Sequence, residues 1–205
     1  MAERLANNGF TLRQLLDFWL ENANPRRSEG TSFECTGQIN FKTTTNEVVK
    51  TILIPQSAGK GAYMNVMKGG KHKADVLVSH WWGARFYDDI LCIAQHATGL
   101  SGYFLEFFVN NDLQHDEDAL EELGVHSDVF EKTYWMCIFA VDEHISICGE
   151  CWGCHKALGD KWEAAHYRAD PCLVCGKAKY NPCSCGSVKY PTGHPLSEVD
   201  KFHKV

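Results

Sequence analysis

Cysteine clustering is the feature that most constrains how this chain can fold. Seven of its ten cysteines lie between residues 148 and 185. Two Cys-x-x-Cys pairs, Cys148/Cys151 and Cys172/Cys175, have 20 residues between them, which is at the upper edge of the spacing of a tetrahedral zinc site. This stretch is rich in Gly and Pro and has little periodicity, so it needs a cross-link to fold. A bound metal ion provides one.

The two pairs form our first choice for one closed, structural zinc site, because an all-thiolate site leaves no open position for catalysis. A second zinc would be held by the remaining cysteines with a histidine, and an interleaved pairing of all the ligands is an equal alternative. We therefore expect one or two zinc ions, and the ligand candidates beyond the first four are Cys154, His155, Cys183 and Cys185, with His166 or His194 as alternative histidines.

Two other interpretations of the cysteines carry less weight. The run 148–154 begins like a bacterial ferredoxin motif, but the fourth cysteine followed by proline is missing, which disfavours an iron–sulfur cluster. Buried or free thiols without metal are the second alternative. Disulfides would need a secretory route, and the first residues show no apolar signal segment.

Composition narrows the class of protein. The 205 residues are 44% hydrophobic and 12% aromatic, enough to bury a core in one domain with a small module. The net charge of -6 disfavours a nucleic-acid partner. No run is long enough to span a bilayer, so we expect a soluble, cytoplasmic protein without a membrane partner.

The patterns divide the chain into four regions. Residues 1–73 are expected to form a helical arm, with helices capped by Thr11 and by a Thr44–Glu47 capping box, the second ending at Pro55. The β-branched residues of 48–54, in the second of these helices, leave a strand as the alternative for that segment. Residues 74–147 should form an α/β core, 148–195 the metal-binding module, and 196–205 the start of a helix, either short or part of a longer protein.

The core should be α/β, with a short parallel sheet flanked by helices. Apolar runs at 74–79, 103–109 and 134–141 predict strands, and 86–96 and the acidic segment near 117–123 predict helices. No Lys or Arg occurs between Arg85 and Lys132. We interpret this acidic stretch as a solvated helix face, because it lacks the pattern of a calcium loop.

Polar clusters follow two of the predicted strands. Because the carboxyl ends of adjacent parallel strands meet at one edge, these clusters would face one crevice. Histidines there could act in acid/base chemistry or bind a metal, and tryptophans could stack on a planar ligand. The candidate catalytic residues are His80, His144, Asp142 and Glu143, and the candidate ligand-binding residues are Trp81, Trp82 and Gly83. The alternative is that these side chains only pack, and Cys92 and Cys137 are interpreted as core residues.

Two motifs carry a resemblance. The stretch Ser-His-Trp-Trp-Gly at 79–83 and the Tyr-Trp-x-Cys-x-Phe-Ala pattern at 134–140 resemble a group of largely uncharacterised protist proteins. More distantly, strand 75–79 followed by helix 86–96 resembles the opening of a TIR-type domain, a flavodoxin-like signalling fold. Some TIR-type domains cleave NAD with a glutamate on a later helix, and no residue of this chain matches that glutamate.

The leading function is an intracellular interaction or signalling module stabilised by zinc, with a protein partner. The alternative is an enzyme that uses the sheet-edge crevice, either as a nucleotide-directed hydrolase or with a bound metal. An enzyme needs His80 and His144 together in a pocket with a carboxylate nearby. A scaffold would instead show packed histidines and an exposed apolar patch.

Overall fold

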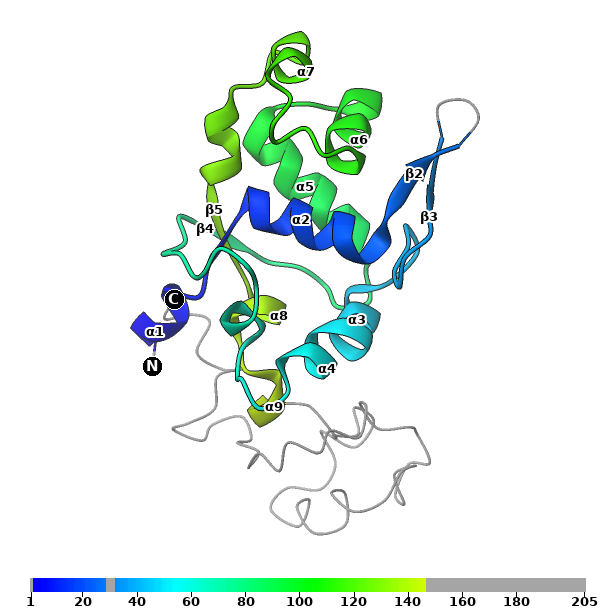
Figure 1. Ribbon diagram of the computed structural model, residues 1–205. Coiled ribbons are helices and arrows are strands. Elements are labelled where there is room, and N and C mark those ends of the chain that lie inside the picture. Colours follow the sequence, from blue (N-terminus) through cyan, green and yellow to red (C-terminus); the bar gives the residue numbers. More distant parts are fainter. Residues whose placement is uncertain (1, 29–31, 147–205) are drawn as a thin grey trace.

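The computed structural model describes residues 2–28 and 32–146 (Figure 1). The predicted module 148–195 and the predicted helix at 196–205 lie outside these residues. The helices are α1 (Ala2–Ala6), α2 (Leu12–Ala23), α3 (Thr45–Val48), α4 (Ile54–Ser57), α5 (Phe86–Thr98), α6 (Gly102–Asn110), α7 (Glu117–Glu122), α8 (Cys137–Ala140) and α9 (Glu143–Ser146), with the π-helical turn η1 (Val49–Leu53) and the 3-10 turns η2 (Tyr63–Asn65) and η3 (Ser127–Glu131). The strands are β1 (Phe10–Thr11), β2 (Pro25–Arg27), β3 (Phe33–Cys35), β4 (Val76–Val78) and β5 (Thr133–Met136).

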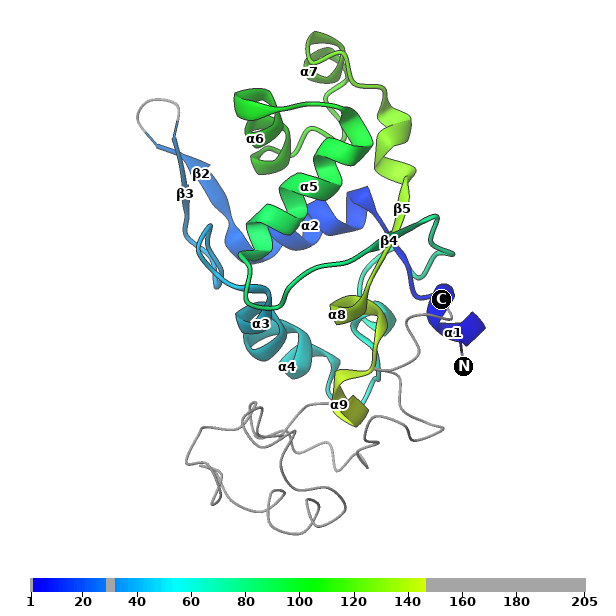
Figure 2. The same cartoon turned by 180° about the vertical axis from the view of Figure 1, so that it is seen from behind.

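The central sheet has three strands in the order β1-β5-β4. Strands β4 and β5 are parallel, with Val78 opposite Met136, whereas β1 pairs antiparallel to β5. The α/β class is therefore confirmed, but the sheet is mixed. A second pair, β2 and β3, forms an antiparallel hairpin that projects from the body in both views (Figures 1 and 2).

Several predicted elements are confirmed. Strand β4 falls within 74–79, helix α5 covers 86–96, and α7 lies in the acidic segment. Both threonine capping boxes are present, at Thr11 for α2 and at Thr44 for α3. Each of these elements has a strong local signal, either a helix cap or a periodic pattern of apolar residues. Such signals depend on residues close in sequence and not on tertiary packing.

The predicted strand at 103–109 is wrong, because this segment is helix α6. Leu105, Phe108 and Val109 are buried, which is the i, i+3, i+4 spacing of a helix. The predicted strand at 134–141 is only half right, since β5 ends at Met136 and the chain continues as α8. Short apolar runs buried on several sides do not separate strand from helix by periodicity.

The helix opened by Thr44 does not end at Pro55 as predicted. Its third segment, α4, begins at Ile54 and runs to Ser57, with the proline in its first turn. The π-helical turn η1 precedes it and shifts the hydrogen-bond register. Pro55 lies in the first turn of α4, the part of a helical segment in which proline is best tolerated. The strand alternative for this segment is wrong.

One hydrophobic cluster joins residues from both sides of the predicted boundary at residue 73. Leu15 and Trp19 of α2 and Ile90 of α5 are fully buried in it, together with Phe139. Helices α2 and α5 contact each other at the centre of the molecule (Figure 1). Within the described residues, no helix combines the length and the apolar character needed to cross a bilayer.

A half-buried carboxylate joins α3 to α5. The Thr45 hydroxyl donates to Oδ2 of Asp89 at 2.8 Å, and desolvation raises the pKa of Asp89 to about 6 from its ordinary 3.8. The folded state thus holds this proton more tightly than the unfolded state. Stability from this group is complete below about pH 4 and is lost as the pH rises through about 6.

Asp89→Asn is expected to raise the free energy of unfolding at pH 7 by about 1 kcal/mol, a value reduced because solvent partly screens the carboxylate. Asparagine keeps an oxygen that accepts from Thr45 and carries no charge. Urea unfolding measured from pH 4 to pH 7 should show the difference from wild type growing as the pH rises. Asp112→Asn is the matched control, because Asp112 is exposed, lies outside α5 and does not contribute to the raised pKa of Asp89. A difference independent of pH would contradict the assignment.

Candidate functional site

The carboxyl ends of β4 and β5 meet at one edge of the sheet, as predicted. Because Val78 lies opposite Met136, the loop after β4 meets the first turn of α8. His80 lies in this loop, and Cys137 is the first residue of α8. The partner that follows β5 at this edge is therefore Cys137, whereas Asp142, Glu143 and His144 come after α8.

His80 and Cys137 form a close pair. The His80 Nε2 atom lies 3.8 Å from the Cys137 sulfur, and the His80 ring also bonds the backbone of Val78. The side chain of Trp82 donates a hydrogen bond to the same sulfur. His80, Trp82 and Cys137 are each half-buried, so the cluster is packed into the sheet edge.

The charges of this pair do not suit nucleophilic catalysis. Burial lowers the pKa of His80 to about 4, so the ring is neutral at pH 7. Burial, with the negative charge of Glu143 adding to it, raises the pKa of Cys137 to about 12. A reactive cysteine needs a depressed pKa and a cationic neighbour. Both groups are instead neutral, and the thiol is a poor nucleophile.

His144 is packed elsewhere. Its side chain is 1% exposed, and its Nε2 atom lies 3.1 Å from the Ser57 hydroxyl of α4. Ser57 donates to the Leu53 carbonyl at 2.6 Å, so its oxygen is left to accept from the imidazole N–H. The backbone N–H of His144 donates to Oδ1 of Asp142 at 2.9 Å. The two predicted catalytic histidines thus engage different partners.

The other predicted site residues, Glu143, Trp81 and Gly83, differ in their burial and in their contacts. Glu143 is 4% exposed, and its charge reaches Cys137. Trp81 is 75% exposed, and its indole lies across Gly83, where a Cβ atom would stand 2.6 Å from the ring. A side chain at position 83 would therefore displace the exposed ring of Trp81 from this position. Of the predicted stacking residues, Trp81 is the one open to solvent.

The predicted metal ligands cannot be placed in this geometry, since all of them fall in 147–205, outside the described residues. They are Cys148, Cys151, Cys154, His155, Cys172, Cys175, Cys183 and Cys185, and the alternatives His166 and His194 fall there too. Across 2–28 and 32–146, no three His, Cys, Asp or Glu side chains are grouped so that they could hold a metal ion.

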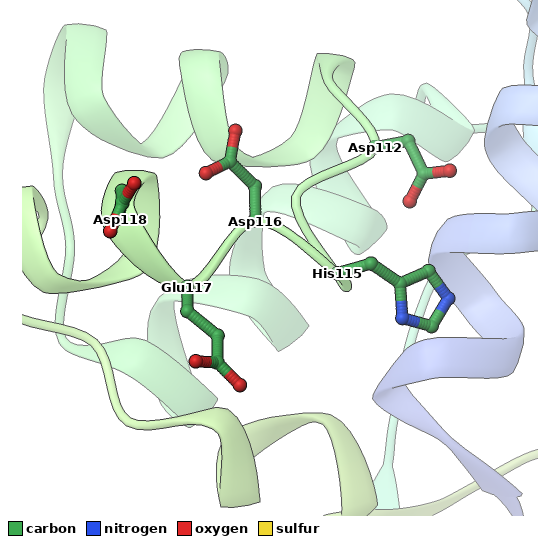
Figure 3. A pocket seen from close by; sticks show the side chains of 5 residues that line it. All are labelled: Asp112, His115, Asp116, Glu117 and Asp118. Carbon is green, nitrogen blue, oxygen red and sulfur yellow. The ribbon is translucent and has the colours of Figure 1, made fainter.

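An open hollow of about 520 Å³ is lined by the loop that follows α6 and by the first turn of α7. Figure 3 shows the five side chains that line it, which are Asp112, His115, Asp116, Glu117 and Asp118. Asp116 caps α7, because its side chain accepts from the backbone N–H of Ala119 at 3.0 Å. Carboxylates around an open hollow remain hydrated, as expected for a solvated acidic face.

The sequence interpretation missed two residues of the site. Cys137 was expected mid-strand in the core, but it is the half-buried first residue of α8. The available signal was the parallel pairing itself, because adjacent parallel strands end at the same edge. Ser57 had no signal, since its contact with His144 spans 87 residues. Cys92, also expected in the core, is exposed on α5.

Comparison with known proteins adds no relatives. A scan against models of protein families, a search of curated proteins and a search of solved structures each found no match. The fold class of the described residues rests on the structure alone: helices around a small mixed sheet, in the α/β class.

Thiol reactivity tests the neutral pair. At pH 8, iodoacetamide should modify Cys92 at least about tenfold faster than Cys137, because the Cys137 thiolate is nearly absent at that pH. Peptide mapping by mass spectrometry separates these two sites from the cysteines of 148–185. His80→Ala is the matched variant, and it should not slow the modification of Cys137. Fast, His80-dependent alkylation of Cys137 would contradict the neutral pair.

Proposed function

We propose that this protein is an intracellular interaction or signalling module, with structural zinc held by the cysteine-rich segment. The observation that carries the proposal is the separate packing of the two histidines. His144 is buried against Ser57, and His80 is neutral beside Cys137. This is the arrangement expected of a scaffold, since an enzyme of the kind considered needs both histidines in one pocket.

Exposed aromatic side chains support a binding role. Tyr103 and Phe104 of α6 and Trp81 after β4 are all exposed. Aromatic residues are enriched where proteins dock, because each contributes a large contact area at a small entropic cost. The zinc remains a proposal from cysteine spacing alone. The resemblance to TIR-type signalling domains is a hypothesis that points in the same direction.

Peptide selection tests this function directly. The full chain, immobilised and loaded with zinc, is screened against a random library of peptides about 16 residues long, which matches a helix of about four turns. We expect enriched peptides whose binding is retained in His80→Ala. The enzyme alternative is assayed in parallel with ATP, GTP and NAD, and no turnover above background is expected. An empty selection, or turnover that His80→Ala abolishes, overturns the proposal.

A further inference from the structure

Helix α6 presents three aromatic side chains on its outer face. Phe104 is 59% exposed, Tyr103 is 45% exposed, and Phe107 is half-buried. The ring centroids lie 5.9 Å apart for Tyr103 and Phe104 and 6.2 Å apart for Tyr103 and Phe107. The three rings are therefore contiguous, and we call them the α6 aromatic face.

The α6 aromatic face is separate from the side of α6 that packs against the core. The helix already buries Leu105, Phe108 and Val109 against the body of the protein. The outward side of a surface helix is normally charged or polar. Here the outward side carries the exposed rings of Tyr103 and Phe104 with Glu106, and Phe107 lies at its border, partly packed against the core. Among the described residues, nothing buries the rings of Tyr103 and Phe104.

The stretch of sequence that contains the α6 aromatic face is strongly acidic. Residues 86–131 contain eleven Asp and Glu and no Lys or Arg, although the rest of the chain has more basic than acidic residues. The hollow of Figure 3 follows directly after the C-terminal end of α6 and contributes four carboxylates. None of the ion pairs formed within the described residues includes a carboxylate of 112–122.

The rings and the carboxylates lie on consecutive segments of the chain, α6 and the loop and helix that follow it. The nine residues of α6 span about 13 Å, which is two to three turns of a helix. Helices α6 and α7 lie at the same end of the molecule in both views (Figures 1 and 2). A ligand with apolar side chains on one side and cations beside them would cover the rings and pair with the carboxylates.

We propose that the α6 aromatic face and the carboxylates of the hollow dock a basic amphipathic helix from a partner protein. The inference rests on the proposed function and specifies its partner. Aromatic rings supply the central contact, and the acidic surround favours and orients a cationic ligand. A second copy of this chain fits less well, because its basic loop within the described residues, 68–73, is glycine-rich and has no apolar side chain to cover the rings.

The test uses a fluorescent peptide of about 16 residues made of Leu and Lys at helical spacing, with the same peptide carrying Glu for Lys as the control. Anisotropy titrations with the full, zinc-loaded chain are run at about 50 mM and about 300 mM NaCl. The Lys peptide should bind with a Kd in the micromolar range, weakened about tenfold at the higher salt. The Glu peptide should not saturate the protein.

Matched variants locate the contact. Tyr103→Ser with Phe104→Ser should weaken binding at least about tenfold. Glu117→Gln with Asp118→Asn should weaken it and also reduce its salt dependence. Leu77→Ser removes an exposed apolar residue of β4, and it should leave the Kd unchanged. Thermal melting confirms that each variant remains folded.

Each contrary outcome is informative. Equal binding of the Glu peptide, or equal loss of affinity in Leu77→Ser, overturns the inference. A concentration-dependent dimer in sedimentation that Phe104→Ser abolishes assigns the face to a second copy and also overturns it. If peptides selected from the random library bind at α6 but lack basic residues, this inference fails while the proposed function stands. If no peptide is selected, both fail.

Discussion

Phe139→Ala is expected to destabilise the protein by about 3–5 kcal/mol, the cost of removing a large aromatic side chain from a packed core. Phe139 is fully buried in α8. Its ring contacts those of Phe10 at 5.2 Å and Phe18 at 5.3 Å, and those of Tyr63 at 6.0 Å and Phe86 at 6.2 Å. These partners belong to β1, α2, η2 and α5, so one ring joins four elements.

Urea unfolding monitored by tryptophan fluorescence measures this loss. Proteins of this size are stable by about 5–15 kcal/mol, so the variant should lose a large part of its stability and unfold at a much lower urea concentration. Phe104→Ala is the matched control, since it removes the same ring from an exposed position and should cost no more than about 0.5 kcal/mol. A loss below about 1 kcal/mol in Phe139→Ala would mean that this ring does not organise the core.

Cys172→Ser combined with Cys175→Ser is expected to lower the zinc content and to destabilise the chain. Metal binding contributes about 10 kcal/mol or more in small zinc modules, because the site forms only as the module folds. Elemental analysis of the purified wild type should give one to two zinc per chain. The double variant should have at least one zinc fewer and should melt at a lower temperature.

Cys35→Ser and Cys92→Ser are the matched controls for the zinc experiment. Both cysteines lie within the described residues and outside any group of three metal-ligating side chains. They should leave the zinc content unchanged. Iron with a brown colour in the wild type would contradict the structural-zinc assignment. Unchanged zinc and unchanged melting in the double variant would show that the ligands lie elsewhere.

The two proposals make different demands on the molecule. Zinc is predicted to bind within 148–185, because of the spacing of the cysteines there. The docking prediction concerns α6 and its acidic surroundings, within the described residues. Zinc removal tests how the chain is stabilised, and the Tyr103 and Phe104 variants test what the chain binds.

Local signals in the sequence predicted part of the fold correctly. Thr11 and Thr44 each begin a helix, because a threonine side chain satisfies a backbone N–H in the first turn of the helix wherever that helix later packs. The apolar run before Ser79 predicted β4, and the periodic segment after Arg85 predicted α5. These features depend on neighbours within a few residues.

The secondary structure of segments buried on several sides could not be predicted from such local signals. The apolar runs at 103–109 and 137–140 fit a strand or a helix equally well by composition. Their helical state depends on what surrounds them, as for Phe139, whose ring lies among side chains from four other elements. Tertiary packing overrides weak local preference in such segments.

The sequence by itself determined the helix caps, the parallel pair of strands and the expectation that His80 lies at their carboxyl edge, because each follows from short-range chemistry or from the pairing of adjacent strands. Only the tertiary structure decided that His80 meets Cys137, that His144 is buried against Ser57, and that Tyr103 and Phe104 of α6 are exposed. Those three outcomes depend on how distant segments pack together, and packing distributes side chains between core and surface only when the whole chain has folded.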